Sequence, residues 1–304
     1  AKGWNGQKNH GLYNRETNTD SPLMPQGITE FTNAGMMAGL ATVNFSEDTY
    51  KDFNGFYGAM STYGSFSYLK YGPIRLFSQI AQDSDLKVGK LIWVAGHSGP
   101  ETAEDSRTHF GIFATGVTQL FPDGYIVNIH PWEHNEVAPA LVAAFNTDFP
   151  FIGFLPIFHK VTIPDRKALG MASHLEAAKG AYIIKDYDKD RKKEGLVIVR
   201  GTSSTNSVVE LLPRIKTEGP NVKIVAAISW VLFQKQPESY RNSIIAPNEW
   251  HDAMVITNGG RRLMHKWMAN KIVEEYSLPT VWPNRWRSGR TVDDRVDEAH
   301  LSPR

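Results

Sequence analysis

The chain of 304 residues contains no cysteine, which excludes disulfide scaffolds, thiolate nucleophiles and cysteine-ligated metal sites. Long apolar runs are also missing, and the longest of them, such as residues 150–158, are far shorter than a bilayer span. The polar N-terminal residues show no apolar stretch of the kind found in signal peptides. We therefore expect no membrane segment and a cytoplasmic location.

An excess of either charge is lacking too, because 33 Lys and Arg residues face 32 Asp and Glu residues. Proteins that bind nucleic acids or membrane surfaces normally carry a basic face, so this balance argues against both classes. Apolar residues make up 41% and charged residues 21%, which is typical of a folded globular protein. At this length, we expect two domains rather than a single core.

Apolar runs separated by helix-length segments indicate an α/β fold with two parallel-sheet domains. The expected strands are residues 90–95, 125–129 and 150–158, followed by 196–199, 222–228 and 253–257. We expect helices from Pro25 onward and over residues 204–216 and 261–276. The charged run 186–194 indicates a solvated turn or the edge of a linker. These features predict a first domain over residues 1–165, a linker over 166–194 and a smaller domain over 195–304.

Glu30 opens the first predicted helix and shares one helical face with Ala34 and Met37. If that face is partly buried, desolvation would raise the pKa of Glu30 and let it hold or share a proton near neutrality. The alternative is a solvated glutamate in a first helical turn, where the helix dipole favours negative charge.

A polar loop follows the predicted strand 90–95 and holds His97, Glu104, Asp105 and His109. Ligand sites of open parallel sheets lie beyond the carboxyl ends of the strands, so this loop is well placed for acid–base chemistry. A metal site lacks support because the ligand spacing is not compact. A polar loop with incidental histidines is the other interpretation.

Aromatic residues and glycines alternate shortly before that strand. The aromatic members are Phe53, Phe56, Tyr57, Tyr63, Phe66, Tyr68 and Tyr71. Such a stretch either forms core or presents a flat face for a heteroaromatic ring. Glycine-rich phosphate loops of the Walker or dinucleotide type are absent from the sequence.

In their order along the chain, these stretches resemble the pyrimidine-binding domain of transketolases. Gly27-Ile28-Thr29-Glu30-Phe31 is similar to the family's Gly-x-x-Glu-Phe signature. Ser61-Thr62-Tyr63 and the following Phe66 resemble the stretch whose ring stacks on the pyrimidine. His97 and the run 104–109 resemble the family's strand-ending histidine and its Glu-Asp-x-x-Thr-His loop.

The resemblance continues beyond this loop and into the second domain. His130-Pro131 and Asn135-Glu136-Val137 resemble the family's Arg-Pro and Asn-Glu-Val positions. The run 233–236 and Tyr240-Arg241 resemble its Phe-x-Lys-Gln and Tyr-Arg pair. In all, the likeness covers residues 25 to about 275.

The resemblance implies a thiamine diphosphate-dependent transferase that moves a two-carbon ketol unit from a ketose to an aldose. Glu30 would share a proton with N1′ of the aminopyrimidine, while His97 and His109 would hydrogen-bond substrate hydroxyls and carry protons. Asp105 would orient the substrate's C2 hydroxyl. The implied site residues are Glu30, His97, Asp105 and His109 for catalysis, Glu30, Tyr63 and Phe66 for the cofactor, and His97, Asp105, Arg107 and His109 for the substrate.

Departures from the family point to a second chain. The Gly-Asp-Gly…Asn motif that binds diphosphate and Mg²⁺ or Ca²⁺ is absent from the sequence, as are the opening strand and phosphate contacts of the pyrimidine domain. We therefore expect an N-terminal, diphosphate-binding transketolase subunit or fragment as partner, in an α2β2 assembly. Residues 155–159 stand where the family has a phosphate-gripping Ser-Arg, and Arg107 replaces a proline. Anion recognition would then move to Arg107 or Lys160, with a modified or sulfonated sugar as a candidate substrate.

Two alternatives stay open. One is a β-type subunit of a 2-oxo acid dehydrogenase, although the separation of His97 from His109 follows transketolases and not the adjacent histidines of that group. The other is a subunit that only assembles or regulates another protein, against which the joint presence of Glu30, Asp105 and both histidines argues. The sequence decides neither the donor and acceptor sugars nor whether the chain is a natural subunit or a fragment.

Overall fold

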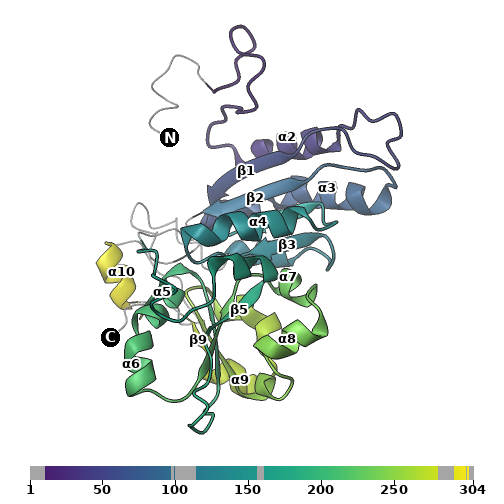
Figure 1. The fold of residues 1–304 in the computed structure, drawn as a ribbon. Helices are drawn as coiled ribbons and strands as arrows, with labels where there is room; N and C mark the ends of the chain where they lie inside the picture. Colours follow the sequence, from purple (N-terminus) through teal and green to yellow (C-terminus); the bar gives the residue numbers. More distant parts are fainter. Residues whose placement is uncertain are drawn as a thin grey trace.

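The computed structural model describes residues 11–96, 99, 114–155, 161–279, 291–298 and 300. Over these ranges the chain forms two α/β units, each around its own sheet (Figure 1). All neighbouring strands are parallel except one pair in the second sheet. The predicted fold class is confirmed.

The first sheet has four parallel strands. Their spatial order is β1 (Gly58–Tyr63), β2 (Leu91–Gly96), β4 (Phe151–Phe154) and β3 (Ile126–Ile129). Strand β1 has no counterpart among the predicted strands, because its run Gly-Ala-Met-Ser-Thr-Tyr has too few large apolar residues. The register pairs Tyr63 with Gly96, so the carboxyl ends of β1 and β2 lie side by side.

Helices pack on both faces of this sheet. They are α2 (Glu30–Thr42), α3 (Tyr71–Asp83) and α4 (Val137–Phe145), with the 3-10 segments η1 (Gly64–Lys70), η3 (Ala114–Gln119) and η4 (His134–Glu136). Ala34 of α2 shares a core cluster with Phe151, whereas Ala140 of α4 shares another with Ile152. Because successive residues of a strand point to opposite faces, α2 and α4 lie on opposite sides of β4.

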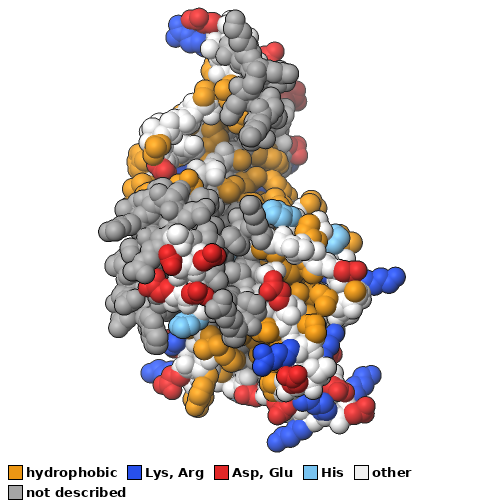
Figure 2. Space-filling model, turned by 90° about the vertical axis from the view of Figure 1, so that its left-hand side faces the viewer, with side chains coloured by type: hydrophobic (Ala, Val, Ile, Leu, Met, Phe, Trp, Pro, Cys, Tyr) orange, Lys and Arg blue, Asp and Glu red, His pale blue; other side chains and the backbone are white. Residues whose placement is uncertain are grey.

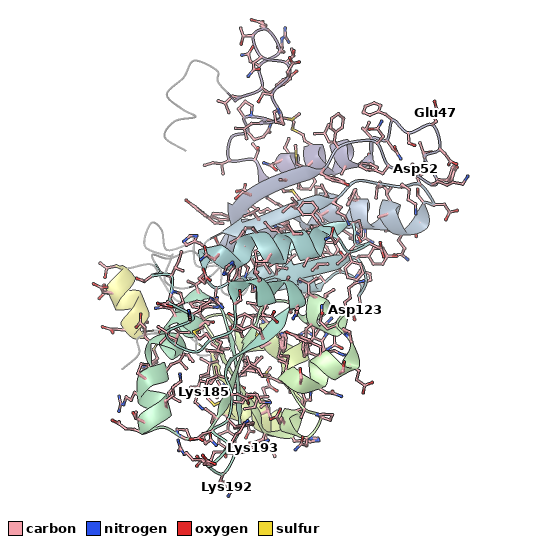
Figure 3. All side chains as sticks on the ribbon, viewed as in Figure 1. Glu47, Asp52, Asp123, Lys185, Lys192 and Lys193 are labelled. Carbon is pink, nitrogen blue, oxygen red and sulfur yellow. The ribbon has the colours of Figure 1, made fainter. Side chains whose placement is uncertain are left out.

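The second sheet has five strands. Their order is β5 (Ala181–Lys185), β7 (Lys223–Ala227), β6 (Leu196–Arg200), β8 (Ala253–Thr257) and β9 (Leu278–Pro279), with β5 antiparallel to β7. Strand β5 lies inside the expected linker 166–194, so the second sheet takes in residues that precede 195. The exposed charged run 186–194 forms the turn into β6, and Lys192 and Lys193 lie at its tip (Figure 3).

The helices of the second unit are shorter than predicted. They are α5 (Thr202–Glu210), α6 (Leu212–Thr217), α7 (Trp230–Gln234), α8 (Glu238–Ile244), α9 (Lys271–Tyr276) and α10 (Val292–Glu298), with η5 (His174–Lys179), η6 (Glu249–Asp252) and η7 (Arg261–Trp267). A continuous helix over 204–216 is wrong, because Pro213 has no amide hydrogen and restarts the helix at α6. A single helix over 261–276 is also wrong, because Asn270 caps a new helix with a hydrogen bond to the Val273 amide.

The two units share one apolar core. Helix α4 lies on the side of the first sheet that faces the second unit, and Ala140 and Ala144 belong to the same cluster as Tyr182 of β5 (Figure 1). The main-chain amide of His130 donates to the Ile228 carbonyl oxygen across the junction, at 2.7 Å. No helix in the described part of the chain has the length and apolar character needed to cross a bilayer.

Candidate functional site

Glu30 is the first residue of α2, and its side chain is half-buried. Its Oε1 accepts a hydrogen bond of 3.1 Å from Oγ1 of Thr62, near the carboxyl end of β1. This bond joins two of the sequence motifs, the one around Glu30 and the Ser-Thr-aromatic stretch. One turn further along α2, Oδ1 of Asn33 is buried without a hydrogen-bond partner. The result is a carboxylate held at the edge of the sheet, with a second oxygen acceptor nearby.

Tyr63 directly follows Thr62, the hydrogen-bond partner of this carboxylate, and Phe66 comes soon after it in the chain. Tyr63 ends β1 in register with Gly96, and Phe66 follows in η1. The two rings are half-buried, with centroids 6.3 Å apart and planes inclined by 34°. Two aromatic rings thus lie at the carboxyl edge of the sheet, where parallel α/β sheets bind ligands.

The other predicted aromatic residues separate into different groups. Phe53 stacks on Tyr57 at 5.7 Å, and Tyr71 meets Phe121 edge-to-face at 5.4 Å. Tyr71 borders the core, because it packs against the cluster of buried residues that contains Phe121. Only the part of the aromatic stretch nearest Glu30 in the sheet therefore fits the ligand-stacking interpretation.

Lys70 is a residue that sequence reasoning missed. Its side chain is fully buried, and its Nζ donates to the Ser61 carbonyl oxygen at 3.0 Å. Burial lowers the pKa of Lys70 to about 8, although the nearby Glu30 carboxylate opposes that shift. The one sequence signal was a lysine between aromatic residues, Tyr68 and Tyr71, in a stretch for which core was one of the two interpretations.

The histidine loop lies outside the described residues. This holds for His97, Asp105, Arg107 and His109, and also for Lys160. Their proposed roles stay predictions. Strand β2 ends at Gly96, directly before His97 in sequence, and Gly96 pairs with Tyr63.

Comparisons with known proteins show which proteins this chain resembles. The family model for the transketolase-like C-terminal domain matches residues 180–275. A probable transketolase of Schizosaccharomyces pombe is 27% identical over 298 residues, which is 90% of this chain and 38% of that protein. The transketolase of Nostoc sp. is 29% identical over 189 residues, which is 62% of this chain and 26% of that protein.

The fold of the chain is also similar to that of a transketolase. The solved structure of the Leishmania mexicana transketolase superposes with a TM-score of 0.67 at 16% identity, over 94% of this chain and 37% of that one. The chain is therefore similar to transketolases in sequence and in fold, and residues 180–275 match the transketolase-like C-terminal domain. It spans about a quarter to two-fifths of the length of these relatives.

Glu136, one of the positions that resemble transketolases, belongs to a buried cluster of hydrogen bonds and ion pairs. It is buried, it accepts a hydrogen bond of 2.8 Å from Arg166, and it is hydrogen-bonded to the Tyr182 hydroxyl. Arg166 also contacts Glu133 at 2.9 Å, and Trp132 donates to Tyr182 at 2.7 Å. This cluster ties the first unit to β5, so the transketolase-like Asn-Glu-Val run here holds the two units together.

Two carboxylates of this cluster share one guanidinium. Burial raises the pKa of Glu136 to about 7, against the opposing effect of its hydrogen bonds from Tyr182 and Arg166. Arg166 was not recognised from the sequence, because its partners lie 30 and 33 residues away. Within the described residues, no group of His, Asp and Glu side chains is arranged to hold a metal ion.

Proposed function

We propose that this chain is the pyrimidine-binding and C-terminal portion of a thiamine diphosphate-dependent enzyme that transfers a two-carbon ketol unit from a ketose to an aldose. The observation that carries the proposal is the Glu30–Thr62 hydrogen bond beside Tyr63 and Phe66, at the carboxyl edge of β1. The similarity to transketolases supports it, and a cytoplasmic location stays a prediction.

The residues present fit the aminopyrimidine part of the cofactor. A half-buried carboxylate fixed by Thr62 can bind a protonated ring nitrogen, and the buried, unpartnered Oδ1 of Asn33 adds an acceptor close to it in the helix. Tyr63 and Phe66 offer faces for a flat ring. When bound, thiamine diphosphate supplies a thiazolium carbon nucleophile and an electron sink for cleaving the bond beside a ketose carbonyl.

The proposed roles of this chain's residues follow from that chemistry. Glu30 holds or releases a proton at its carboxylate, and Tyr63 and Phe66 position the ring. His97 and His109 exchange protons with substrate hydroxyls, and Asp105 accepts a hydrogen bond from the C2 hydroxyl. We propose Arg107 or Lys160 as the group that binds the substrate's anionic end.

A partner completes the proposed site with diphosphate and Mg²⁺ or Ca²⁺. The chain covers only 38% of the fission-yeast relative, and large apolar side chains remain uncovered around Glu30. Ile28 is 95% and Phe31 64% exposed. Exposed apolar surface of this kind marks an interaction site. We propose that it meets an N-terminal transketolase subunit or segment in an α2β2 arrangement.

The first test is Glu30→Gln in the chain reconstituted with its N-terminal portion, thiamine diphosphate and Mg²⁺. Ketol transfer from a ketose to an aldose should fall by about 10²-fold or more, because the glutamine cannot take up a proton. Glu47→Gln is the matched control, since Glu47 is exposed at the far end of the first unit (Figure 3). Unchanged transfer in Glu30→Gln would refute the proposed role and favour a purely structural subunit.

The same reconstituted preparation can be used to distinguish ketol transfer from the reaction of a 2-oxo acid dehydrogenase. Incubation with 2-oxo acids and lipoamide should yield no acylated lipoamide, while a ketose and an aldose should exchange two carbons. Acylation without ketol exchange would overturn the proposal in favour of that alternative.

A further inference from the structure

A cavity of about 310 Å³ lies at the junction of the two units. Its first-unit wall comes from η3 and β3, and its second-unit wall comes from the ends of β6 and β7 and from η7. Of the residues assigned above to the cofactor, all of which the structure describes, none lines this cavity. It is therefore distinct from the site around Glu30, Tyr63 and Phe66, and it is large enough for a small organic ligand.

Arg200 is the buried charge of this cavity. It is the last residue of β6, its exposed fraction is 7%, and its Nη1 donates to the Leu263 carbonyl oxygen at 3.0 Å. None of the ion pairs formed by the described residues includes Arg200. Burial lowers the pKa of Arg200 to about 9, since nothing nearby compensates the lost hydration of its charge.

A buried guanidinium without a carboxylate is unusual, because such a charge is costly unless a counter-charge or full hydrogen bonding compensates it. Two other buried cations among the described residues follow that rule, since Arg166 pairs with two glutamates and Lys223 pairs with Glu249 at 2.8 Å. One carbonyl bond leaves most of the five donors of Arg200 for another acceptor. The guanidinium therefore has unused capacity to bind an anion at a cavity wall.

The rest of the lining is suited to an organic anion. His130 lies within electrostatic reach of Arg200, and burial together with that positive charge lowers its pKa well below the usual value, so it is a neutral donor or acceptor. Lys266 also lines the cavity, and it pairs with the exposed Asp123 at 2.6 Å. The apolar walls are Phe121, Ile126, Leu155, Trp230, Leu263 and Trp267.

We propose that this cavity binds a small organic oxyanion, a carboxylate or a phosphate ester, with Arg200 as the anchoring cation and the aromatic walls around the ligand's apolar body. Contacts between the units border the cavity: Gln119 donates to the Leu263 carbonyl oxygen at 2.9 Å, which Arg200 also contacts. A bound anion therefore strengthens the junction of the two units. The site does not depend on the proposed ketol transfer.

The test titrates the intact chain with inorganic phosphate and, in a parallel arm, with malonate, each against chloride at equal ionic strength. Two readouts apply: the thermal unfolding midpoint and tryptophan fluorescence, since Trp230 and Trp267 line the cavity. At least one anion should give a saturable response beyond that of chloride. The arm that binds more tightly distinguishes a phosphate ligand from a carboxylate ligand.

Arg200→Gln should weaken that binding by about tenfold or more, the usual effect of losing charge-assisted hydrogen bonds. Arg214→Gln is the matched control and should bind as the wild type does, because Arg214 lies on the surface of α6 with a side chain 72% exposed. If Arg200→Gln does not fold, Arg200→Lys replaces it. Lysine keeps the charge but not the planar fork, so several-fold weakening is expected.

Lys266→Gln in the cavity lining provides an independent variant with little risk to folding, and it should weaken binding by a few fold. The proposal is overturned if neither anion binds beyond chloride. It is also overturned if the folded Arg200 variant and Lys266→Gln both bind with wild-type affinity.

Discussion

Individual residues in this protein derive their chemistry from burial rather than from their sequence neighbours. Glu30 opens a helix, which by itself predicts a solvated side chain, yet Thr62 holds it at the edge of the first sheet. Lys70, eight positions beyond Thr62, is buried beside the same carboxylate. Burial lowers the pKa of this lysine, and perturbed lysines of this kind are frequent at functional sites.

Lys70→Met should remove the part of the pH dependence of the unfolding free energy that Lys70 causes. The pKa of Lys70 is about 8 in the folded chain and about 10.4 when unfolded. The unfolded chain therefore binds more protons between these values, and this lysine makes the wild type more stable as the pH rises from about 8 toward 10. Urea unfolding at pH 7.5 and 9.5 should show that gain relative to Lys70→Met.

The matched variant Lys87→Met changes an exposed lysine and should leave the gain intact. If wild type and Lys70→Met have the same pH dependence, the side chain of Lys70 is solvated, contrary to the structure.

At the scale of elements, the decisive segments are the short connections. Segment η5 is followed by its C-cap residue Gly180, whose φ of +84° lies in the left-handed region. The main-chain carbonyl oxygen of Gly180 accepts hydrogen bonds from the amides of Ile228 and Ser229. A Cβ at Gly180 would meet the Ser229 carbonyl oxygen at 2.4 Å and the Phe233 amide nitrogen at 2.3 Å. Main-chain atoms cannot move aside as a flexible side chain would. Glycine at this position is therefore required both by backbone conformation and by close approach.

Gly180→Ala should destabilise the chain by roughly 3 kcal/mol or more, which combines left-handed strain with a main-chain clash. Gly124→Ala separates the two effects. Its φ is +97° with open space around the site, so only the strain applies and the loss should be about 1–2 kcal/mol. The free energies of unfolding are measured with urea. If both variants lose the same free energy of unfolding, the clash at Gly180 is relieved by movement of the α7 region.

At the scale of the whole molecule, side chains at the junction fix the position of one unit relative to the other. The cluster of Glu133, Glu136 and Arg166 reaches Tyr182 of the second sheet and lies in a continuous apolar core. A buried ion cluster contributes little net stability against apolar residues, but it is costly to break, so it specifies one relative placement of the units.

Glu136→Gln should alter the pH dependence of unfolding. Because the pKa of Glu136 is about 7 when folded and near 4.3 when unfolded, the folded chain binds more protons between these values. This carboxyl group therefore makes the wild type less stable as the pH rises from about 4.5 to 7, by at most roughly 4 kcal/mol. Urea unfolding at pH 5 and pH 8 should show that loss relative to Glu136→Gln.

Glu238→Gln, which changes an exposed residue of α8, should keep the wild-type loss. A Glu136→Gln variant that loses as much stability as the wild type would contradict a raised pKa at this position.

The sequence alone was sufficient for most of the strand positions, the α/β class and the family likeness, but it missed β1 and β5. Strands β2, β3, β6, β7 and β8 are short apolar runs, and the Glu30, Tyr63 and Phe66 motifs are local patterns whose signal lies in neighbouring residues. Helix breaks were missed where one proline or one cap outweighed a continuous apolar pattern.

Only the tertiary structure decided which residues meet. The bond between Glu30 and Thr62 spans 32 positions, and the contact between Arg200 and Leu263 spans 63. Burial of Lys70 and Arg200 likewise follows from packing, because charged residues in a sequence are expected at the surface. Long-range pairing and desolvation arise from the packing of all the elements, and no local pattern in the sequence encodes them.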